Sequence, residues 1–554
     1  MPENSHPHVL DHDVAHWLSH WAQVRPSALA WADDHRRCNY AEAEDRVARL
    51  AGWMSDQGIV VGDRIAVWLG NRGATLEAIF AAARLGAIAL PVNARLTPDE
   101  VAFQFDDCTP KVVIAERSWR ERANKTAELL SEANPSWLEI GEAPGASGAA
   151  ASSDSVAANA HETGCAYEAA IAESRPVACR PNPSADDAMI LMYTSGTTGK
   201  PKGALLPLRK TLYNCLNAER YFDIRSEDRV LVVAPLFHSL GLQILAIPTI
   251  FAGAGLVIQE GFDAVRVWQA IQSEDITYYG GVPTMHQRML DALDREEPFG
   301  TPPACLRFAF TAGAAAPSEL IRAYHDRGLA MKQGYGQTET SILTCLDSEQ
   351  TLTKAGSVGR PVHHATLRLI DPATIEGDVS GWRDVETGEV GEIVVNGPIT
   401  MLGYWQRAEA TAETIRGDWL RTGDLATQDA DLDVTLVGRV REMYISGGEN
   451  VYPAEVEATL VDHPDIEEAA VISVPDAEWG EIGRAHLVAA TGRTLRAEPI
   501  AEWLSTRLAR YKQPRSFIIE TELPRTASGK VQKHRLAASK DGSEDGSEDG
   551  SDQN

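Results

Sequence analysis

The chain has 554 residues, of which 44% are hydrophobic and 23% are charged. This length predicts two or more domains with large cores, and the composition is typical of a soluble globular enzyme. The formal net charge of −28 argues against nonspecific binding of nucleic acids or anionic membranes.

Short apolar runs of the kind found in buried strands alternate with helical stretches along the first half of the chain. The strand-like runs include residues 65–68, 112–115 and 230–233, and the helical stretches include 75–85 and 264–273. This alternation predicts an α/β fold of layered helices and mainly parallel sheets.

Composition also predicts a surface insertion and the cellular compartment of the protein. Residues 145–163 are rich in alanine, serine and glycine, which predicts a surface insertion. The seven cysteines are dispersed and form no CxxC pair, a pattern typical of reduced thiols in the cytosol. The polar residues 1–13 lack the features of a signal peptide. We therefore expect a cytoplasmic protein.

Residues 193–203 read Tyr-Thr-Ser-Gly-Thr-Thr-Gly-Lys-Pro-Lys-Gly and follow an apolar run, 188–192, that predicts a buried strand. Glycines let backbone N–H groups approach a phosphate, hydroxyls add neutral donors, and lysines add positive charge. This is no Walker A loop, because Pro201 stands where Ser or Thr would hold magnesium. The segment predicts a nucleotide-phosphate site. Its candidate residues are Thr194, Ser195, Gly196, Thr197, Thr198, Gly199, Lys200 and Lys202.

Residues 239–259 contain no charged side chain and are long enough to suggest a transmembrane helix. Pro248 and the glycines at 253 and 255 interrupt this stretch. We therefore predict a buried helix, a turn and a core strand at 256–258, and no transmembrane segment.

A boundary near residue 438 separates the long first part from a small α+β unit. This unit is predicted to contain helices at 454–461 and 500–509 and a strand at 469–473. The last residues, 540–554, repeat Gly, Ser, Glu and Asp, which predicts a disordered acidic tail.

Six motifs in a fixed order resemble those of the adenylate-forming superfamily, which includes acyl-CoA synthetases, aryl-CoA ligases and peptide-synthetase adenylation domains. The motifs occupy residues 193–203, 235–238 (Pro-Leu-Phe-His), 334–339 (Gly-Tyr-Gly-Gln-Thr-Glu), 421–424 (Arg-Thr-Gly-Asp), 438–450 and 524–530 (Pro-Arg-Thr-Ala-Ser-Gly-Lys). The resemblance implies a large N-terminal domain over residues 1–438, a hinge at 439–441 and a small mobile lid domain over 442–539.

The resemblance also implies roles for single residues in binding ATP and Mg²⁺. Glu339 and Thr194 would hold the ion, since hard cations prefer oxygen donors. Tyr335 would stack on adenine and Thr338 would contact the α-phosphate. In the family, residues matching Asp424 and Arg439 bind the ribose. Lys530 resembles the family's catalytic lysine, which neutralises charge that develops at the α-phosphate.

Segments that line the acyl pocket in the family are uncharged here, and burying an unpaired charge would be costly. We therefore expect an apolar acid. The candidate pocket residues are His238, which would also gate between two half-reactions, Leu242, Tyr279, Gly313 and Gly336. The resemblance further implies a CoA tunnel at Gly447 and Gly448 and a hinge residue at Arg441, where relatives usually have Asp or Lys.

These residues predict an ATP-dependent acid–CoA ligase that works through an acyl adenylate and pyrophosphate, with ATP, Mg²⁺ and CoA as its small molecules. We favour a medium-chain or long-chain fatty acid as substrate. A hydroxycinnamate or another aryl acid is the alternative, as is an acyl-AMP ligase that loads a carrier protein without CoA. A homodimer is left open.

Overall fold

The computed structural model describes residues 13–141, 166–194, 201–295, 301–314, 316–354, 356–446, 449–476, 479–525 and 531–538. The predicted insertion at 145–163 and the acidic tail lie outside these residues. The chain divides into two compact units. The first comprises residues up to 368 together with 394–422 and 429–434, and the second comprises 369–393, 423–428 and the residues from 435 onward. The predicted domain boundary and hinge stay predictions.

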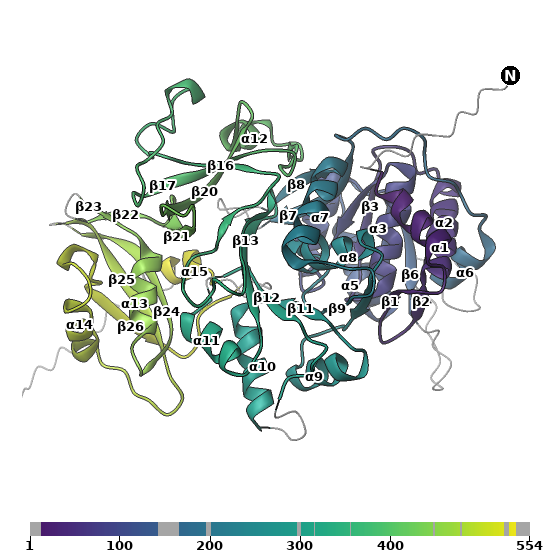
Figure 1. Cartoon of the computed structure of the whole chain (residues 1–554). Coiled ribbons are helices and arrows are strands. Elements are labelled where there is room, and N and C mark those ends of the chain that lie inside the picture. Colours follow the sequence, from purple (N-terminus) through teal and green to yellow (C-terminus); the bar gives the residue numbers. More distant parts are fainter. Residues whose placement is uncertain are drawn as a thin grey trace, which may run out of the picture. The chain divides into compact units, whose positions relative to one another are not determined.

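A nine-stranded sheet forms much of the first unit and has the strand order β15-β14-β13-β12-β11-β9-β10-β1-β2 (Figure 1). Neighbours from β13 to β1 are parallel, and β14, β15 and β2 are antiparallel at the two edges. In this order, the strands are β15 (Arg360–Pro361), β14 (Ser341–Leu346), β13 (Met331–Gln337), β12 (Phe308–Thr311), β11 (Tyr278–Gly281), β9 (Arg229–Val232), β10 (Gly255–Ile258), β1 (Leu29–Ala32) and β2 (Arg37–Asn39).

A seven-stranded sheet of the same unit has the order β18-β8-β7-β4-β3-β5-β6. Strands β3 to β7 are parallel in this sheet, and β8 returns antiparallel beside β7. In this order, the strands are β18 (Gly403–Tyr404), β8 (Lys202–Pro207), β7 (Ala188–Thr194), β4 (Ile88–Pro91), β3 (Arg64–Trp68), β5 (Val112–Glu116) and β6 (Ser136–Ile140). The predicted strands and the parallel α/β character are confirmed.

Helices of the first unit cover these sheets and bury their apolar side chains. One core cluster joins the nine-stranded sheet to α9, α10 and α11, and another joins the seven-stranded sheet to α4 and α5. The helices are α1 (Ala15–Val24), α2 (Tyr40–Asp56), α3 (Gly73–Leu85), α4 (Pro98–Cys108), α5 (Arg120–Leu129), α6 (Ala166–Glu173), α7 (Leu208–Phe222), α8 (Ile247–Phe251), α9 (Ala264–Ser273), α10 (Pro283–Arg295), α11 (Ser318–Asp326) and α12 (Ala408–Thr414), with the short 3₁₀ helix η1 (Arg117–Trp119).

The uncharged stretch at 239–259 folds as a π-helix η2 (Leu240–Ala246), then α8, a turn and strand β10. Its members are largely buried within the first unit. None of the helices among the described residues combines the length and the apolarity needed to cross a membrane. The predicted helix, turn and strand are confirmed, and the π-helical form of the first part is new.

A five-stranded sheet with the order β16-β17-β20-β19, and with β21 paired to β20, contains the 421–424 motif. Its strands are β16 (Thr366–Ile370), β17 (Gly391–Asn396), β20 (Trp419–Gln428), β19 (Ile415–Arg416) and β21 (Val434–Arg439). The short 3₁₀ helix η3 (Val379–Gly381) lies between β16 and β17 in the chain.

The C-terminal part of the second unit is an α+β layer, as predicted. Its five-stranded sheet has the order β23-β22-β25-β24 with β26 paired to β25, and α13 and α14 pack on it in one core cluster. The elements are β22 (Tyr444–Ser446), β23 (Glu449–Val451), α13 (Pro453–Val461), β24 (Ile466–Asp476), β25 (Gly480–Ala489), α14 (Ala497–Ser505), η4 (Arg510–Lys512), β26 (Ser516–Glu520) and α15 (Lys533–Ala538).

The helix predicted at 500–509 begins earlier and ends earlier than its apolar pattern indicated, because α14 spans Ala497–Ser505. Pro499 falls in the first turn of α14, where its missing N–H needs no partner within the helix. A proline therefore does not mark the outer boundary here.

Candidate active site

Segments that follow neighbouring strands of the nine-stranded sheet carry several predicted site residues. Strands β13, β12, β11 and β9 are parallel neighbours, so their carboxyl ends lie at one edge of the sheet (Figure 1). His238 follows β9, Gly313 follows β12, and Glu339 follows β13. Ligands of open α/β sheets bind outside the carboxyl ends of the strands. The fold therefore brings these three segments to the edge where a substrate is expected.

A tight turn between β13 and β14 carries the residues predicted to bind the nucleotide. Tyr335 is buried on β13, and Thr338 and Glu339 are half-buried in the turn. The backbone N–H of Gln337 donates to Thr340 Oγ1 at 3.1 Å, which closes the turn. One short segment thus holds the predicted adenine, phosphate and metal contacts.

Glycine is required beside this turn. A Cβ added at Gly336 would lie 1.8 Å from the carbonyl oxygen of Ser341, so a larger residue would force the hairpin apart. Gly313 has a φ of 86°, which is the left-handed region that favours glycine. Both residues therefore have a backbone reason for their identity, and their contact with an acyl group stays a prediction.

Two further side chains connect the predicted metal ligands, Thr194 and Glu339. Thr194 ends β7, and its Oγ1 donates to the carbonyl oxygen of Lys202 on β8 at 3.3 Å. The Lys202 ammonium lies 5.3 Å from the centre of the Tyr404 ring. The Tyr404 hydroxyl donates to Glu339 Oε1 at 2.9 Å. The Glu339 carboxylate and the Thr194 hydroxyl are hard oxygen donors, so these two residues fit Mg²⁺.

Sequence reasoning missed Tyr404, because it lies in none of the recognised motifs and is 65 residues from its partner. It also missed Lys210, in the first turn of α7, which is fully buried and donates a hydrogen bond to Ser341 Oγ. Burial lowers the pKa of Lys210 to about 7, although the nearby Glu339 carboxylate acts in the opposite direction.

The predicted gate and its neighbour lie in the segment between β9 and α8. The backbone N–H of His238 donates to the carbonyl oxygen of Pro235 at 3.1 Å, and its ring centre lies 4.5 Å from that of Phe237. A Cβ at Gly241 would lie 2.4 Å from the same Pro235 oxygen, which explains the glycine in this turn. Leu242 is fully buried in η2.

Tyr279 is fixed by a buried polar network. Its hydroxyl lies 2.9 Å from the Tyr324 hydroxyl and 3.4 Å from His286 Nδ1, inside the core cluster that α9, α10 and α11 share. Burial raises the pKa of Tyr279 above its ordinary value. The neighbouring Tyr278 stacks instead on Phe308, with ring centres 4.8 Å apart. The predicted contact of Tyr279 with the acyl group is not tested by these contacts.

The second unit contains the predicted ribose-binding pair. Asp424 is 5% exposed on β20, and its Oδ1 lies 3.0 Å from Nε of the half-exposed Arg439 at the end of β21. The guanidinium therefore holds the carboxylate in one orientation. Arg441, the predicted hinge residue, lies in the turn that follows β21.

Several predicted site residues lie outside the residues that the structure describes, and their roles stay predictions. They are Ser195, Gly196, Thr197, Thr198, Gly199 and Lys200 of the phosphate loop, Gly447 and Gly448 of the CoA tunnel, and Lys530.

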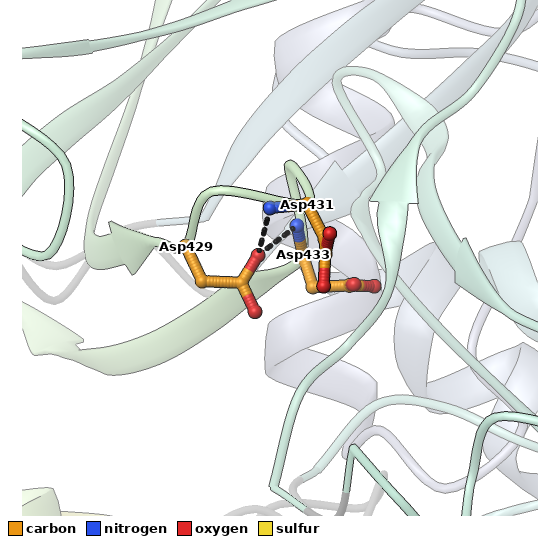
Figure 2. A group of neighbouring side chains, drawn as sticks. All are labelled: Asp429, Asp431 and Asp433. Carbon is orange, nitrogen blue, oxygen red and sulfur yellow. Dashed lines mark hydrogen bonds between the residues drawn. The ribbon is translucent and has the colours of Figure 1, made fainter.

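Three aspartates between β20 and β21 form a separate acidic group (Figure 2). Asp429 Oδ1 accepts the backbone N–H groups of Asp431 and Asp433 at 2.9 and 3.0 Å. The Lys354 ammonium lies 2.6, 2.8 and 3.4 Å from carboxylate oxygens of Asp429, Asp431 and Asp433. An internal cation thus occupies the position that a metal would take, and neither Thr194 nor Glu339 belongs to this group.

Comparisons with known proteins show the family of this chain. The family described as "AMP-binding enzyme" matches residues 18–405, and "AMP-binding enzyme C-terminal domain" matches residues 455–530. The chain is 38% identical to the feruloyl-CoA synthase of an Amycolatopsis species, over 93% of this chain and 97% of the relative. It is 35% identical to the indoleacetate–CoA ligase of Aromatoleum aromaticum, over 94% of this chain and 97% of the relative.

Two further similarities have comparable coverage. The chain is 33% identical to the long-chain-fatty-acid–CoA ligase FadD13 of Mycobacterium tuberculosis, over 94% of this chain and 97% of the relative. The structure of o-succinylbenzoate coenzyme A synthetase from Bacillus subtilis, in complex with ATP and a magnesium ion, superposes with a TM-score of 0.80. The two chains are 27% identical, and the match covers 94% of this chain and 99% of the other.

Proposed function

The chain belongs to the AMP-binding enzyme family and is an AMP-forming acid–CoA ligase; from this premise we propose that the acid it activates is aromatic. The observation that carries the proposal is the likeness to a feruloyl-CoA synthase and an indoleacetate–CoA ligase over nearly the whole chain. Both names describe a carboxylic acid that carries an aromatic ring.

In the proposed reaction, a carboxylate oxygen of the acid attacks the α-phosphorus of ATP, and pyrophosphate leaves. The CoA thiol then attacks the acyl carbonyl carbon of the acyl adenylate, and AMP leaves. Negative charge is spread over the phosphate oxygens in the first step, so positioning and positive charge supply most of the catalysis.

We assign the nucleotide contacts to the residues that match the family's motifs. Tyr335 would contact adenine, Asp424 the ribose hydroxyls, and Thr338 the α-phosphate. Glu339 and Thr194 would hold Mg²⁺, which supplies positive charge to the phosphates when bound. Tyr404 supports this assignment, because its hydroxyl fixes one oxygen of Glu339 and leaves the other available. Lys530 is assigned to the charge that develops at the α-phosphate.

One buried amide in the same segment as the predicted pocket residues His238 and Leu242 leads us to propose a ring with polar substituents. Gln243 follows Leu242 in η2 and is fully buried, and neither polar atom of its side-chain amide has a hydrogen-bond partner among the described residues. An unsatisfied buried polar group costs about 1–3 kcal/mol. An alkyl chain cannot form a hydrogen bond with this amide, whereas a ring that carries a hydroxyl or N–H group can.

This proposal reverses the preference that the sequence suggested. Uncharged pocket segments are compatible with any apolar acid, and the fatty acid was favoured over the aryl acid without a residue that distinguishes the two. A long-chain fatty acid remains the second candidate, because the chain is also 33% identical to FadD13.

The test is acid-dependent exchange of pyrophosphate with ATP, followed by thioester formation with CoA, for ferulate, indoleacetate, cinnamate, octanoate and palmitate. We expect kcat/KM for the best aromatic acid to exceed that for octanoate at least tenfold. Gln243→Leu should lower kcat/KM for ferulate roughly tenfold and leave cinnamate nearly unchanged.

Thr249→Val is the matched control, because Thr249 is also fully buried in the next helix and its hydroxyl donates to the Leu245 carbonyl oxygen at 2.7 Å. Higher kcat/KM for octanoate or palmitate than for every aromatic acid would overturn the proposed substrate class. If Gln243→Leu lowered kcat/KM equally for all acids, Gln243 would not contact the substituents of the acyl group.

A further inference from the structure

Helix α7 has a buried polar stripe on the face that it turns towards the β13–β14 hairpin. Lys210, Asn214 and Asn217 are spaced as i, i+4 and i+7, which places them on one face of a helix. Each is at most 1% exposed. Buried helix faces are normally apolar, so three such residues in a row need an explanation.

Two members of the stripe contact the hairpin, and the third contacts His364, which follows β15. The Lys210 ammonium donates to Ser341 Oγ. Asn214 Oδ1 accepts the backbone N–H of Ile342 at 3.5 Å, and Asn217 Oδ1 accepts that of His364 at 3.3 Å. Two of these contacts reach the first two residues of β14, immediately after the turn that carries Thr338 and Glu339.

The turn needs this support because its backbone is strained. Ser341 has a φ of 59°, a left-handed conformation that is uncommon for a residue other than glycine. Its carbonyl oxygen also lies close against Gly336. A strained residue keeps such a conformation only when its surroundings hold it there, and the Lys210 ammonium binds its side chain directly.

A lysine is a costly way to fill this position. The side chain is fully buried in the first turn of α7, where the helix dipole disfavours a positive charge. Burial lowers its pKa towards 7. A methionine has a similar length and would need no desolvation of an amine. Residues that lower stability where they stand are often kept for activity.

We propose that Lys210 is a positioning residue of the adenylation step, which fixes Ser341 and thereby holds Thr338 and Glu339 against the magnesium nucleotide. This inference rests on the nucleotide and metal roles proposed above for Thr338 and Glu339. It does not depend on which acid is the substrate.

The test compares Lys210→Met, Ser341→Ala and the double variant with the wild-type enzyme, using its best acid. Three quantities are measured: pyrophosphate exchange at varied Mg²⁺ and ATP, thioester formation from supplied acyl adenylate, and the melting temperature. The matched control is Thr211→Val, because Thr211 is the next residue of α7, is fully buried, and contacts Met189 Sδ at 3.7 Å instead of the turn.

We expect Lys210→Met to lower kcat for exchange at least tenfold, or to raise KM for the magnesium nucleotide by that factor, because small displacements of positioned groups are costly to catalysis. Thioester formation from acyl adenylate should change less than threefold. The melting temperature should equal or exceed that of the wild type. Ser341→Ala should reproduce part of the loss, and the two changes should not be additive.

Unchanged exchange kinetics in Lys210→Met would overturn the inference. So would a lower melting temperature with a proportional loss of both half-reactions, since that pattern indicates a role in folding alone. Additive losses in the double variant would show that Lys210 does not act through Ser341. If the wild-type enzyme acted on fatty acids alone, the proposed substrate class would be wrong, but the comparison of the Lys210 and Ser341 variants would still test this inference.

Discussion

Acidification should destabilise the first unit through one buried histidine. His286 on α10 is fully buried, and its Nε2–H donates to the carbonyl oxygen of Phe310 at 3.1 Å. Nδ1 is then the acceptor, 3.2 Å from the Tyr324 hydroxyl and 3.4 Å from that of Tyr279. No charged group contacts this ring among the described residues, so a proton on Nδ1 would meet no compensating charge.

The size of the effect follows from the shift in pKa. Burial lowers the pKa of His286 from its ordinary value of 6.5 to about 4. The unfolded chain therefore binds more protons than the folded one between these two values, and stability falls as the pH decreases through that range. A difference of about 2.5 pH units corresponds to roughly 3 kcal/mol, most of which would be lost by about pH 4.5. Above pH 6.5 this histidine contributes no pH dependence.

The assay is urea unfolding followed by tryptophan fluorescence at several pH values between 7.5 and 4.5. His286→Gln should be less stable than the wild type at pH 7.5, because it disturbs the two tyrosines, but it should lose roughly 2.5 kcal/mol less between pH 7.5 and pH 4.5. His325→Gln is the control, since His325 is exposed on α11 of the same unit. Equal losses for the wild type and His286→Gln would refute the reasoning.

Three further predictions concern the proposed catalytic residues and the acidic group. Lys530→Ala should lower the rate of pyrophosphate exchange roughly 100-fold or more while sparing thioester formation from supplied acyl adenylate, and the opposite pattern would exclude its adenylation role. Arg441→Pro, which fixes φ at the predicted hinge, should leave pyrophosphate exchange nearly unchanged and slow thioester formation. An equal loss of both steps would show that residue 441 is not a hinge. Lys354→Gln should lower the melting temperature because it leaves three carboxylates without their shared ammonium, and millimolar Ca²⁺ should restore it in the variant alone. An equal Ca²⁺ effect on the wild type would contradict the assignment of Lys354 as the cation of this acidic group.

Local patterns predicted most of the fold. The run 188–192 was expected to be a buried strand before the phosphate loop, and β7 spans Ala188–Thr194. The helix expected at 264–273 has the bounds of α9, in which apolar residues repeat with helical spacing and Asp263 caps the first turn. The π-helical form of η2 could not be predicted, since an uncharged run has no periodicity that separates one helical form from another.

Ordered motifs placed Thr194, Glu339, Asp424 and Arg439, but they could not supply the side chains that hold these residues. Glu339 is oriented by a tyrosine 65 residues away on a short edge strand, β18. No local pattern records that pairing, because the contact exists only once two separate sheets have formed. The sequence could not decide between fatty and aromatic acids for a related reason: uncharged pocket segments limit polarity but do not define shape.

The polar stripe on α7 could be predicted from the sequence in part: its spacing could be, and its contacts could not. Its contacts span 131 residues from Lys210 to Ser341, which no sequence pattern reveals. Its spacing, however, is visible in the chain: a lysine and two asparagines at i, i+4 and i+7 share one face of a helix whose other buried residues include Leu208, Cys215 and Ala218. A helix that buries polar groups among apolar ones must find partners for them, because each unmet group costs about 1–3 kcal/mol. The strained turn that carries Glu339 supplies such partners, so the polarity of α7 is a signature of the site even though α7 itself contributes no predicted substrate contact.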